Sequence, residues 1–198
     1  MWETDLESSQ GLGNALRVGN EDDVRVRLAA VLCEPDSALR IAQANYLATQ
    51  HVPWDNEYHG KDDRGVMQIV TNDKLQTVDI FNNDTGSLVR PPDQQDQAFG
   101  KILNSYQLGK AEGLGNALRV GNEGDILNGQ LPGVLADADA KYIIKDANFI
   151  ATQSAPWDQH GPGGMGDETL RINPDMTLDL YNNNTQSVVR SNITKLQK

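Results

Sequence analysis

The sequence predicts an all-β protein built from two tandem domains of short antiparallel strands. Three observations predict it: an internal duplication, alternating runs of strand-forming residues late in each copy, and clusters of turn residues between those runs. Strands of about four to six residues with turn signals every eight to twelve residues or so are typical of all-β domains.

The duplication is clearest in the segment GLGNALRVGNE, which occurs unchanged at residues 11–21 and 113–123. Farther along, TVDIFNNDTGSLVR at 77–90 matches TLDLYNNNTQSVVR at 177–190. The offset between matching residues drifts between 100 and 103, so we expect the copies to differ by short loop changes. Such self-similarity at one period indicates a repeated structural unit.

The repeats set the domain boundaries that we predict. The first repeat covers residues 1–92, a linker covers 93–112, and the second repeat covers 113–198. The linker prediction depends on the Pro91-Pro92-Asp93 turn signal that follows the last matched segment.

Comparing the copies also helps to decide whether some segments are helices or strands. Residues 22–32 and 35–50 could be scanned as helices, but the second copy contains Asn128-Gly129 and Leu131-Pro132-Gly133. Gly and Pro inside a helix are destabilising, so a fold shared by both copies favours extended segments here.

The ends of the repeats carry the strongest strand signals. Thr77–Phe81 and Thr177–Tyr181 alternate between polar and apolar residues and are rich in strand formers. Asn82–Gly86 is a turn cluster that leads to a further strand at Ser87–Arg90.

Composition limits the function. The net charge is −11 and basic residues do not cluster, which disfavours nucleic acid and anionic membranes as partners. Cys33 is the only cysteine, so an intrachain disulfide is impossible. No apolar run approaches the ~20 residues of a membrane span. MWETDLESSQ does not resemble a signal peptide, so we expect a cytoplasmic protein or one released without such a signal.

Enzyme and cofactor signatures are not found in the sequence. There is no nucleophile elbow and no phosphate loop, and we predict neither catalysis nor a cofactor. A metal site at His59 with Asp62 or Asp63 lacks ligand spacing, and Asp137-x-Asp139 lacks the Gly and Glu of a calcium loop. We therefore expect no metal.

The segment ETLRINPDMTLDLYNNNTQSVVRSN at 168–192 resembles the strand-turn-strand unit of bulb-type lectins, the snowdrop-agglutinin-related mannose binders. Residues 125–131 resemble that family's opening segment, and 145–150 resemble its sugar-binding strand. The resemblance implies a β-prism II fold in each repeat and mannose-type glycans as ligands. The family has three strand units per domain, whereas each repeat shows two. A third could come from GLGNALRVGNE, from residues 101–106, from the other repeat or from a partner chain.

The family's pocket motif, Gln-x-Asp-x-Asn-x-Val-x-Tyr, aligns its polar groups on one strand face, because alternate residues of a strand point the same way. Carried over by position, the motif implies three incomplete sugar sites. They comprise Asp146, Asn148, Ile150 and Thr152; Asn173, Asp175, Thr177 and Tyr181; and Gln43, Asn45 and Leu47. Ile144 and Thr152 depart from the motif's Gln and Tyr, so we expect weak or altered mannose-type binding.

Two functions follow as hypotheses. The first is a tandem carbohydrate-binding module that gains from avidity between its repeats. The second is a non-catalytic structural or assembly protein that uses the repeats for protein–protein contacts, including homo-oligomers. The repeated Pro-Trp-Asp, with Trp54 and Trp157, is interpreted mainly as a core tryptophan and secondarily as a sugar contact.

Overall fold

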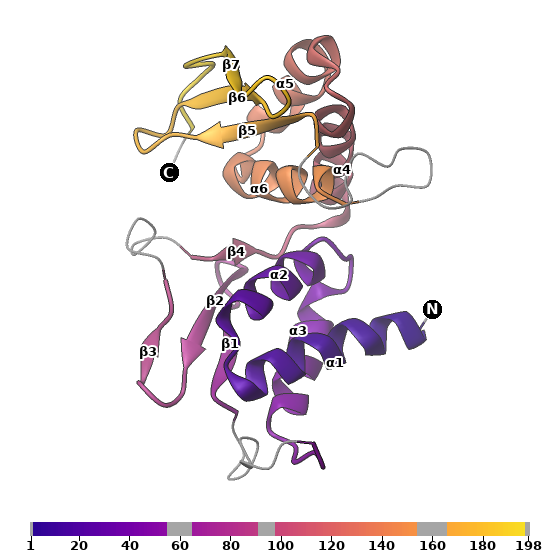
Figure 1. Cartoon of the computed structure of the whole chain (residues 1–198), viewed down its shortest axis with the longest axis vertical. Helices are drawn as coiled ribbons and strands as arrows, with labels where there is room; N and C mark the ends of the chain where they lie inside the picture. The colour runs from indigo at the N-terminus through magenta and orange to yellow at the C-terminus, as the bar shows by residue number, and fades with distance from the viewer. Residues whose placement is uncertain (1, 55–64, 91–97, 154–165, 197–198) are drawn as a thin grey trace. The chain divides into compact units, whose positions relative to one another are not determined.

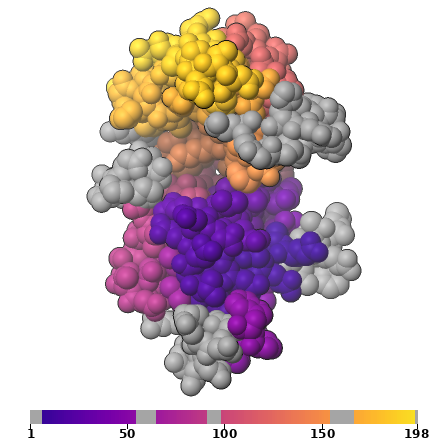
Figure 2. All heavy atoms as spheres, viewed as in Figure 1, coloured from indigo at the N-terminus to yellow at the C-terminus, as the bar shows by residue number. Residues whose placement is uncertain are grey.

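The computed structural model describes residues 2–54, 65–90, 98–153 and 166–196 and divides into two compact units, Met1–Leu103 and Asn104–Lys198 (Figures 1 and 2). Each unit consists of helices followed by a small antiparallel sheet. The prediction of an all-β fold with β-prism domains is therefore wrong, although the sequence duplication appears as two copies of one helix-and-sheet fold.

The first unit begins with three helices and ends with a sheet (Figure 1). Strand β2 pairs with β1 along its length and, on its other side, with β3 and β4. The elements are α1 (Trp2–Val18), α2 (Glu21–Leu32), α3 (Ser37–Ala48), β1 (Met67–Asn72), β2 (Thr77–Asn82), β3 (Ser87–Leu88) and β4 (Gly100–Lys101).

The second unit repeats this order, with β6 between β5 and β7. Its C-terminal tail takes the place of β4, since Thr177 bridges Lys195 as Thr77 pairs with Lys101. The elements are α4 (Ser105–Val120), the π-helical segment η3 (Asp125–Gln130), α5 (Leu131–Leu135), α6 (Ala140–Ala151), β5 (Glu168–Ile172), β6 (Leu178–Asn182) and β7 (Ser187–Arg190). Residues 93–112, assigned above to a linker, include β4 and the first turns of α4.

The helix-breaking residues of the second copy are accommodated without loss of the helix. Pro132 lies in the first turn of α5, where its missing N–H costs no intrahelical hydrogen bond. Asn128 and Gly129 lie in η3, whose wider turns take one residue more than an α-helix. The sequence offset is 102 at Glu123 and 103 at Leu131, so η3 contains the additional residue.

In each unit the helices pack on one another and on one face of the sheet, and this determines the core. Inward residues of β2 alternate, with Val78 and Ile80 buried between half-buried neighbours. They meet a cluster from α1, α2 and α3 that includes Leu12, Leu28 and Ile41. The apolar periodicity of residues 22–32 and 35–50 is thus that of helices facing a sheet.

Candidate functional site

The eleven-residue identity is explained by packing at the end of the first helix of each unit. Arg17 is 1% exposed, and its guanidinium donates to the carbonyls of Leu47 and Gln50, with 2.9 Å between Nε and the Gln50 oxygen. Arg119 makes the same contacts with Ile150 and Gln153. The buried cation binds the free carbonyls at the end of α3 or α6, where positive charge is favoured.

Two glycines of the same block are required by geometry. A Cβ on Gly13 would lie 2.8 Å from Leu47 Cβ and 2.9 Å from the Ala44 carbonyl oxygen, so α1 and α3 approach each other closely there. Gly19 ends α1 in a left-handed conformation (φ 75°), which favours glycine. Gly13, Arg17 and Gly19 of the block thus have structural roles that both copies share.

Two of the three predicted sugar sites lie on helices and not on strands. Asp146, Asn148 and Ile150 lie on α6, and Gln43, Asn45 and Leu47 lie on α3. On a helix, residues two apart are rotated by about 200° and do not share a face. The alignment of polar groups that the resemblance implied is therefore not present at either segment.

Asn45 and Asn148 instead join helix to sheet. The Asn45 amide donates to the Ile69 carbonyl and accepts from the Ile69 N–H, both at 2.8 Å. Asn148 makes the same pair of bonds with Leu170, at 2.7 and 3.0 Å. Each side chain completes a strand's backbone pairing and has a structural role that the sequence alone did not indicate.

The remaining predicted residues are also engaged within the second unit. Asn173, Asp175 and Thr177 form the β5–β6 turn, where the Thr177 hydroxyl donates to Asp175 at 2.6 Å. The side-chain and backbone hydrogen bonds from Thr177 lower the pKa of Asp175. Tyr181 lies on β6 with the Arg171 guanidinium 3.4 Å from its ring centre, and Thr152 caps α6.

An exposed apolar surface lies on α3 of the first unit. Residues at helical spacing form one stripe, which we call the α3 face: Leu39, Ala42, Gln43, Tyr46 and Leu47. Leu39 and Tyr46 are 59% and 64% exposed, although the opposite side of α3 is buried. Ala42, Gln43, Tyr46 and Leu47 line a shallow hollow of about 380 Å³.

Tyr46 also borders a second hollow, of about 240 Å³, between α3 and β1. This hollow is lined by both polar and apolar residues: Asn45, Tyr46, Ala48, Thr49, Gly65, Met67, Gln68 and Asn83. Tyr46 therefore borders two neighbouring hollows. An amphipathic aromatic side chain in this position is typical of interaction surfaces.

Trp54, which follows α3, is exposed as well. It is 57% exposed, with the Arg17 guanidinium 5.5 Å from its ring centre, so the prediction of a core tryptophan is wrong for this residue. Trp157 lies outside the described residues, as do His59, Asp62 and Asp63.

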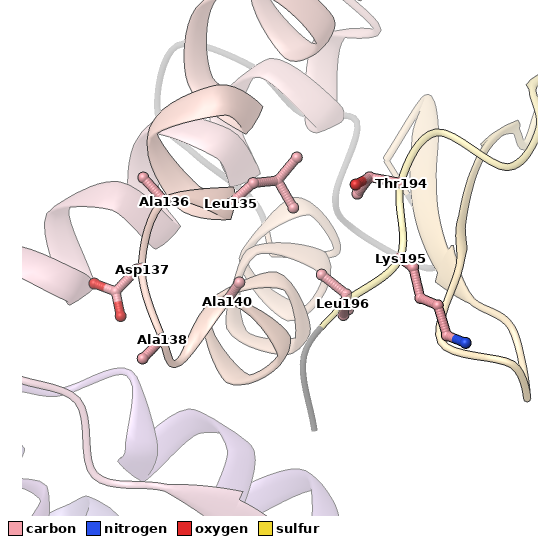
Figure 3. Close-up of a pocket in the computed structure, with 8 residues that line it drawn as sticks. All are labelled: Leu135, Ala136, Asp137, Ala138, Ala140, Thr194, Lys195 and Leu196. Atoms are coloured by element: carbon pink, nitrogen blue, oxygen red, sulfur yellow. The ribbon is translucent and has the colours of Figure 1, made fainter.

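A cavity of about 250 Å³ lies in the second unit between the α5–α6 turn and the C-terminal tail (Figure 3). Its polar side chains do not converge, since Asp137 and Lys195 lie on opposite sides and point apart. In the first unit Gly100 takes the place of Thr194 and packs so closely that a Cβ would lie 2.5 Å from Leu32 Cδ1. Thr194 and Leu135, the counterparts of Gly100 and Leu32, both line the cavity.

Asp137 and Asp139 are held by protein groups. Gln107 donates to Asp137 at 3.1 Å and to Asp139 at 2.8 Å, and Lys110 lies 3.5 Å from Asp137. Burial opposes ionisation of Asp137, but the hydrogen bonds from the Asp139 N–H and Gln107, with Lys110, lower its pKa. The pair thus stabilises the start of α4 and α6.

Two other carboxyls of the second unit have strongly raised pKa values. Burial raises the pKa of Asp146 to about 8. Its counterpart Gln43 accepts a hydrogen bond from Ser9 at 2.9 Å, whereas Ala111 stands at the position of Ser9 in the second copy. Burial is the main cause that raises the pKa of Glu168 to about 8, and the neighbouring Glu123 carboxyl is the second cause. The sequence analysis did not select Glu168. Its one sign in the sequence is that Glu168 aligns with the apolar Met67 of the first copy.

Over the described ranges, no group of three or more His, Cys, Asp or Glu side chains has an arrangement that could hold a metal ion. None of the helices in the described part of the chain is long and apolar enough to cross a membrane.

Comparison with known proteins identifies no relative. No protein-family model, no curated protein and no solved structure matches this chain. A function must therefore be inferred from the chain's own surfaces, of which the α3 face is the most distinctive.

Proposed function

We propose that the chain is a non-catalytic binding module, and that the α3 face docks an apolar, positively charged segment of a partner protein. The observation that carries this proposal is the hollow lined by Ala42, Gln43, Tyr46 and Leu47, with Leu39 and Tyr46 more than half exposed beside it. Exposed aromatic and aliphatic side chains around a hollow are the usual anchoring points of protein interfaces.

The net negative charge of the first unit indicates that the partner segment carries positive charge. Residues 1–103 contain 17 acidic and 9 basic side chains. The only charged residue of α3 is Arg40, which is buried and paired with Asp36 at 2.7 Å and Glu34 at 3.6 Å. Such a surface attracts a segment with Lys or Arg beside its apolar residues and repels a second copy of the same unit.

The second unit differs at this surface, which supports a division of roles. Lys145 and Asp146 stand at the positions of Ala42 and Gln43. The lysine in place of the small apolar Ala42 introduces a charge that makes this surface less suited to an apolar segment. We therefore assign docking to the first unit.

The test is selection from a displayed library of random 16-residue peptides on the immobilised full chain. We expect enriched peptides with apolar residues at helical spacing and a net positive charge. Tyr46→Ala should weaken their binding about tenfold or more, as expected for an anchoring aromatic. Ala42→Lys, which introduces the second unit's residue, should weaken it similarly.

The matched control is Phe149→Ala, at the position of Tyr46 in the second unit, which should leave binding unchanged. Enriched peptides that bind wild type and Tyr46→Ala equally, or that are acidic, would contradict the proposal. Concentration-dependent dimerisation abolished by Tyr46→Ala would identify a second copy as the occupant and would also contradict it.

Carbohydrate binding is a second candidate function, and the exposed ring of Trp54 is the observation that favours it. An exposed indole can pack against the apolar face of a sugar. Binding to mannose-terminated glycans on an array that free mannose competes away, and that Trp54→Ala abolishes, would support this function.

A further inference from the structure

A buried carboxyl occupies a core position at the start of the second unit's sheet. Glu168 is 1% exposed, and both of its carboxylate oxygens are buried. It pairs with Asn182 across the sheet as Met67 pairs with Asn82, and Met67 is 4% exposed. An ionisable group thus stands where the first copy has an apolar one.

A second difference between the copies concerns the carboxyl that faces Glu168. In the first unit Glu21 pairs with Arg25 at 3.1 Å. In the second unit Glu123 stands at the position of Glu21, but Leu127 replaces the arginine. The groups that act on Glu168 are Glu123 from the helix that begins after Asn122, Asp167 beside it on the chain, and Asn182 from β6.

No cation is among these groups. Two carboxylates in contact repel each other, but one proton between them converts the contact into a hydrogen bond. A carboxylic acid is also far less costly to bury than a carboxylate.

We propose that Glu123 and Glu168 of the second unit share one proton, an arrangement that we call the proton clasp. The shared proton holds the start of β5 against the helix that begins at Glu123. When the proton is lost, the buried Glu168 carries a charge that faces the Glu123 carboxylate, and β5 loosens from the helix. The first unit, with Met67 and the Glu21–Arg25 pair, has no such element. The clasp makes one of two duplicated units sensitive to pH.

The sign of the pH dependence follows from the folded and unfolded pKa values of Glu168. Its pKa is about 8 in the folded unit against an ordinary value of 4.5. The clasp therefore contributes fully below pH ~4.5, weakens as pH rises, and is lost once pH exceeds ~8. By linkage, the equilibrium for opening should rise on the order of 50-fold between pH 6 and pH 8.

The experiment is backbone amide hydrogen exchange of the full chain by NMR from pH 6 to pH 9, with a chelator present so that no cation bridges the carboxylates. We expect protection of the Leu170 and Leu180 amides, corrected for intrinsic rates, to fall ~50-fold by pH 8. Protection of the matching Ile69 and Ile80 amides should change little.

Glu168→Gln keeps the shape and a donor without the titration, and it should remove the pH dependence from the second unit. Equal pH dependence in both units, or its persistence in Glu168→Gln, would overturn the proposal. If that variant does not fold, a ¹³C titration of the Glu168 carboxyl in wild type decides. A midpoint near 8 supports the clasp, and one near the ordinary 4.5 overturns it.

Discussion

Removing the buried guanidinium of the second unit by Arg119→Met should destabilise that unit by ~3 kcal/mol. The guanidinium donates to two backbone carbonyls, those of Ile150 and Gln153, at the end of α6. Hydrogen bonds to a charged group contribute about 1.5–3 kcal/mol each, and both acceptors lose their donor in the variant. Methionine restores most of the apolar packing and avoids burying a charge, which reduces the total from ~5 to ~3 kcal/mol.

Urea unfolding followed by the NMR signals of each unit measures this effect, with the first unit in the same sample as reference. Arg190→Met is the matched control, because Arg190 is exposed on β7 and its loss should change stability by less than ~0.5 kcal/mol. Equal effects of the two substitutions, or a second unit made more stable by Arg119→Met, would refute the role given to the buried cation.

Further predictions concern the helices of the second unit and the buried Arg17 of the first unit. Gly115→Ala should destabilise the second unit by ~2–4 kcal/mol, because a Cβ there would lie 2.9 Å from a backbone carbonyl oxygen of α6. Gly109→Ala on the same helix places a Cβ with nothing within 4 Å, and it should stabilise the unit by ~0.5–1 kcal/mol. Thermal unfolding compares the two, and similar effects would contradict the close approach. Deleting Gly129 should convert η3 into regular α-helix with the unit still folded, which a chemical-shift analysis of residues 123–135 would detect; an unfolded second unit would count against this account. Arg17→Lys should destabilise the first unit by ~1–2 kcal/mol, since one ammonium cannot reproduce the fork geometry, and unchanged urea unfolding would speak against it.

The sequence was sufficient for the duplication and for the strands nearest its clearest turns. Thr77–Asn82 and Leu178–Asn182 are strands, and Asn82 begins the turn that follows β2 by accepting from the Thr85 N–H at 3.0 Å. These elements depend on short-range alternation and turn chemistry, which are local properties of the chain.

The helices were missed because a local rule was applied across two copies of unequal length. Pro132 and Gly129 favour extended segments by propensity alone, but a π-helical segment and the first turn of α5 accommodate them. Tertiary packing on the sheet outweighs the propensity cost, since the apolar residues Ile126, Leu131 and Val134 are all buried.

The candidate site was equally difficult to find from sequence. The bulb-lectin motif, carried over by position, assigns Asn45 and Asn148 to sugar sites, although their amides are bonded to a strand's backbone. Glu168 belongs to no motif, and its role follows from the strand register, which places it opposite Asn182 as Met67 lies opposite Asn82. Neither partner is near in sequence, so no local pattern records these contacts.

The π-helical segment also bears on how duplicated proteins tolerate insertions. One added residue in an α-helix turns everything beyond it by about 100°, which would move Leu131 and Val134 out of the core. In this chain the widened turns at 125–130 take up the residue locally, and the inward positions beyond it keep their partners. The second copy could therefore differ in length inside this helix and still bury the apolar positions that follow.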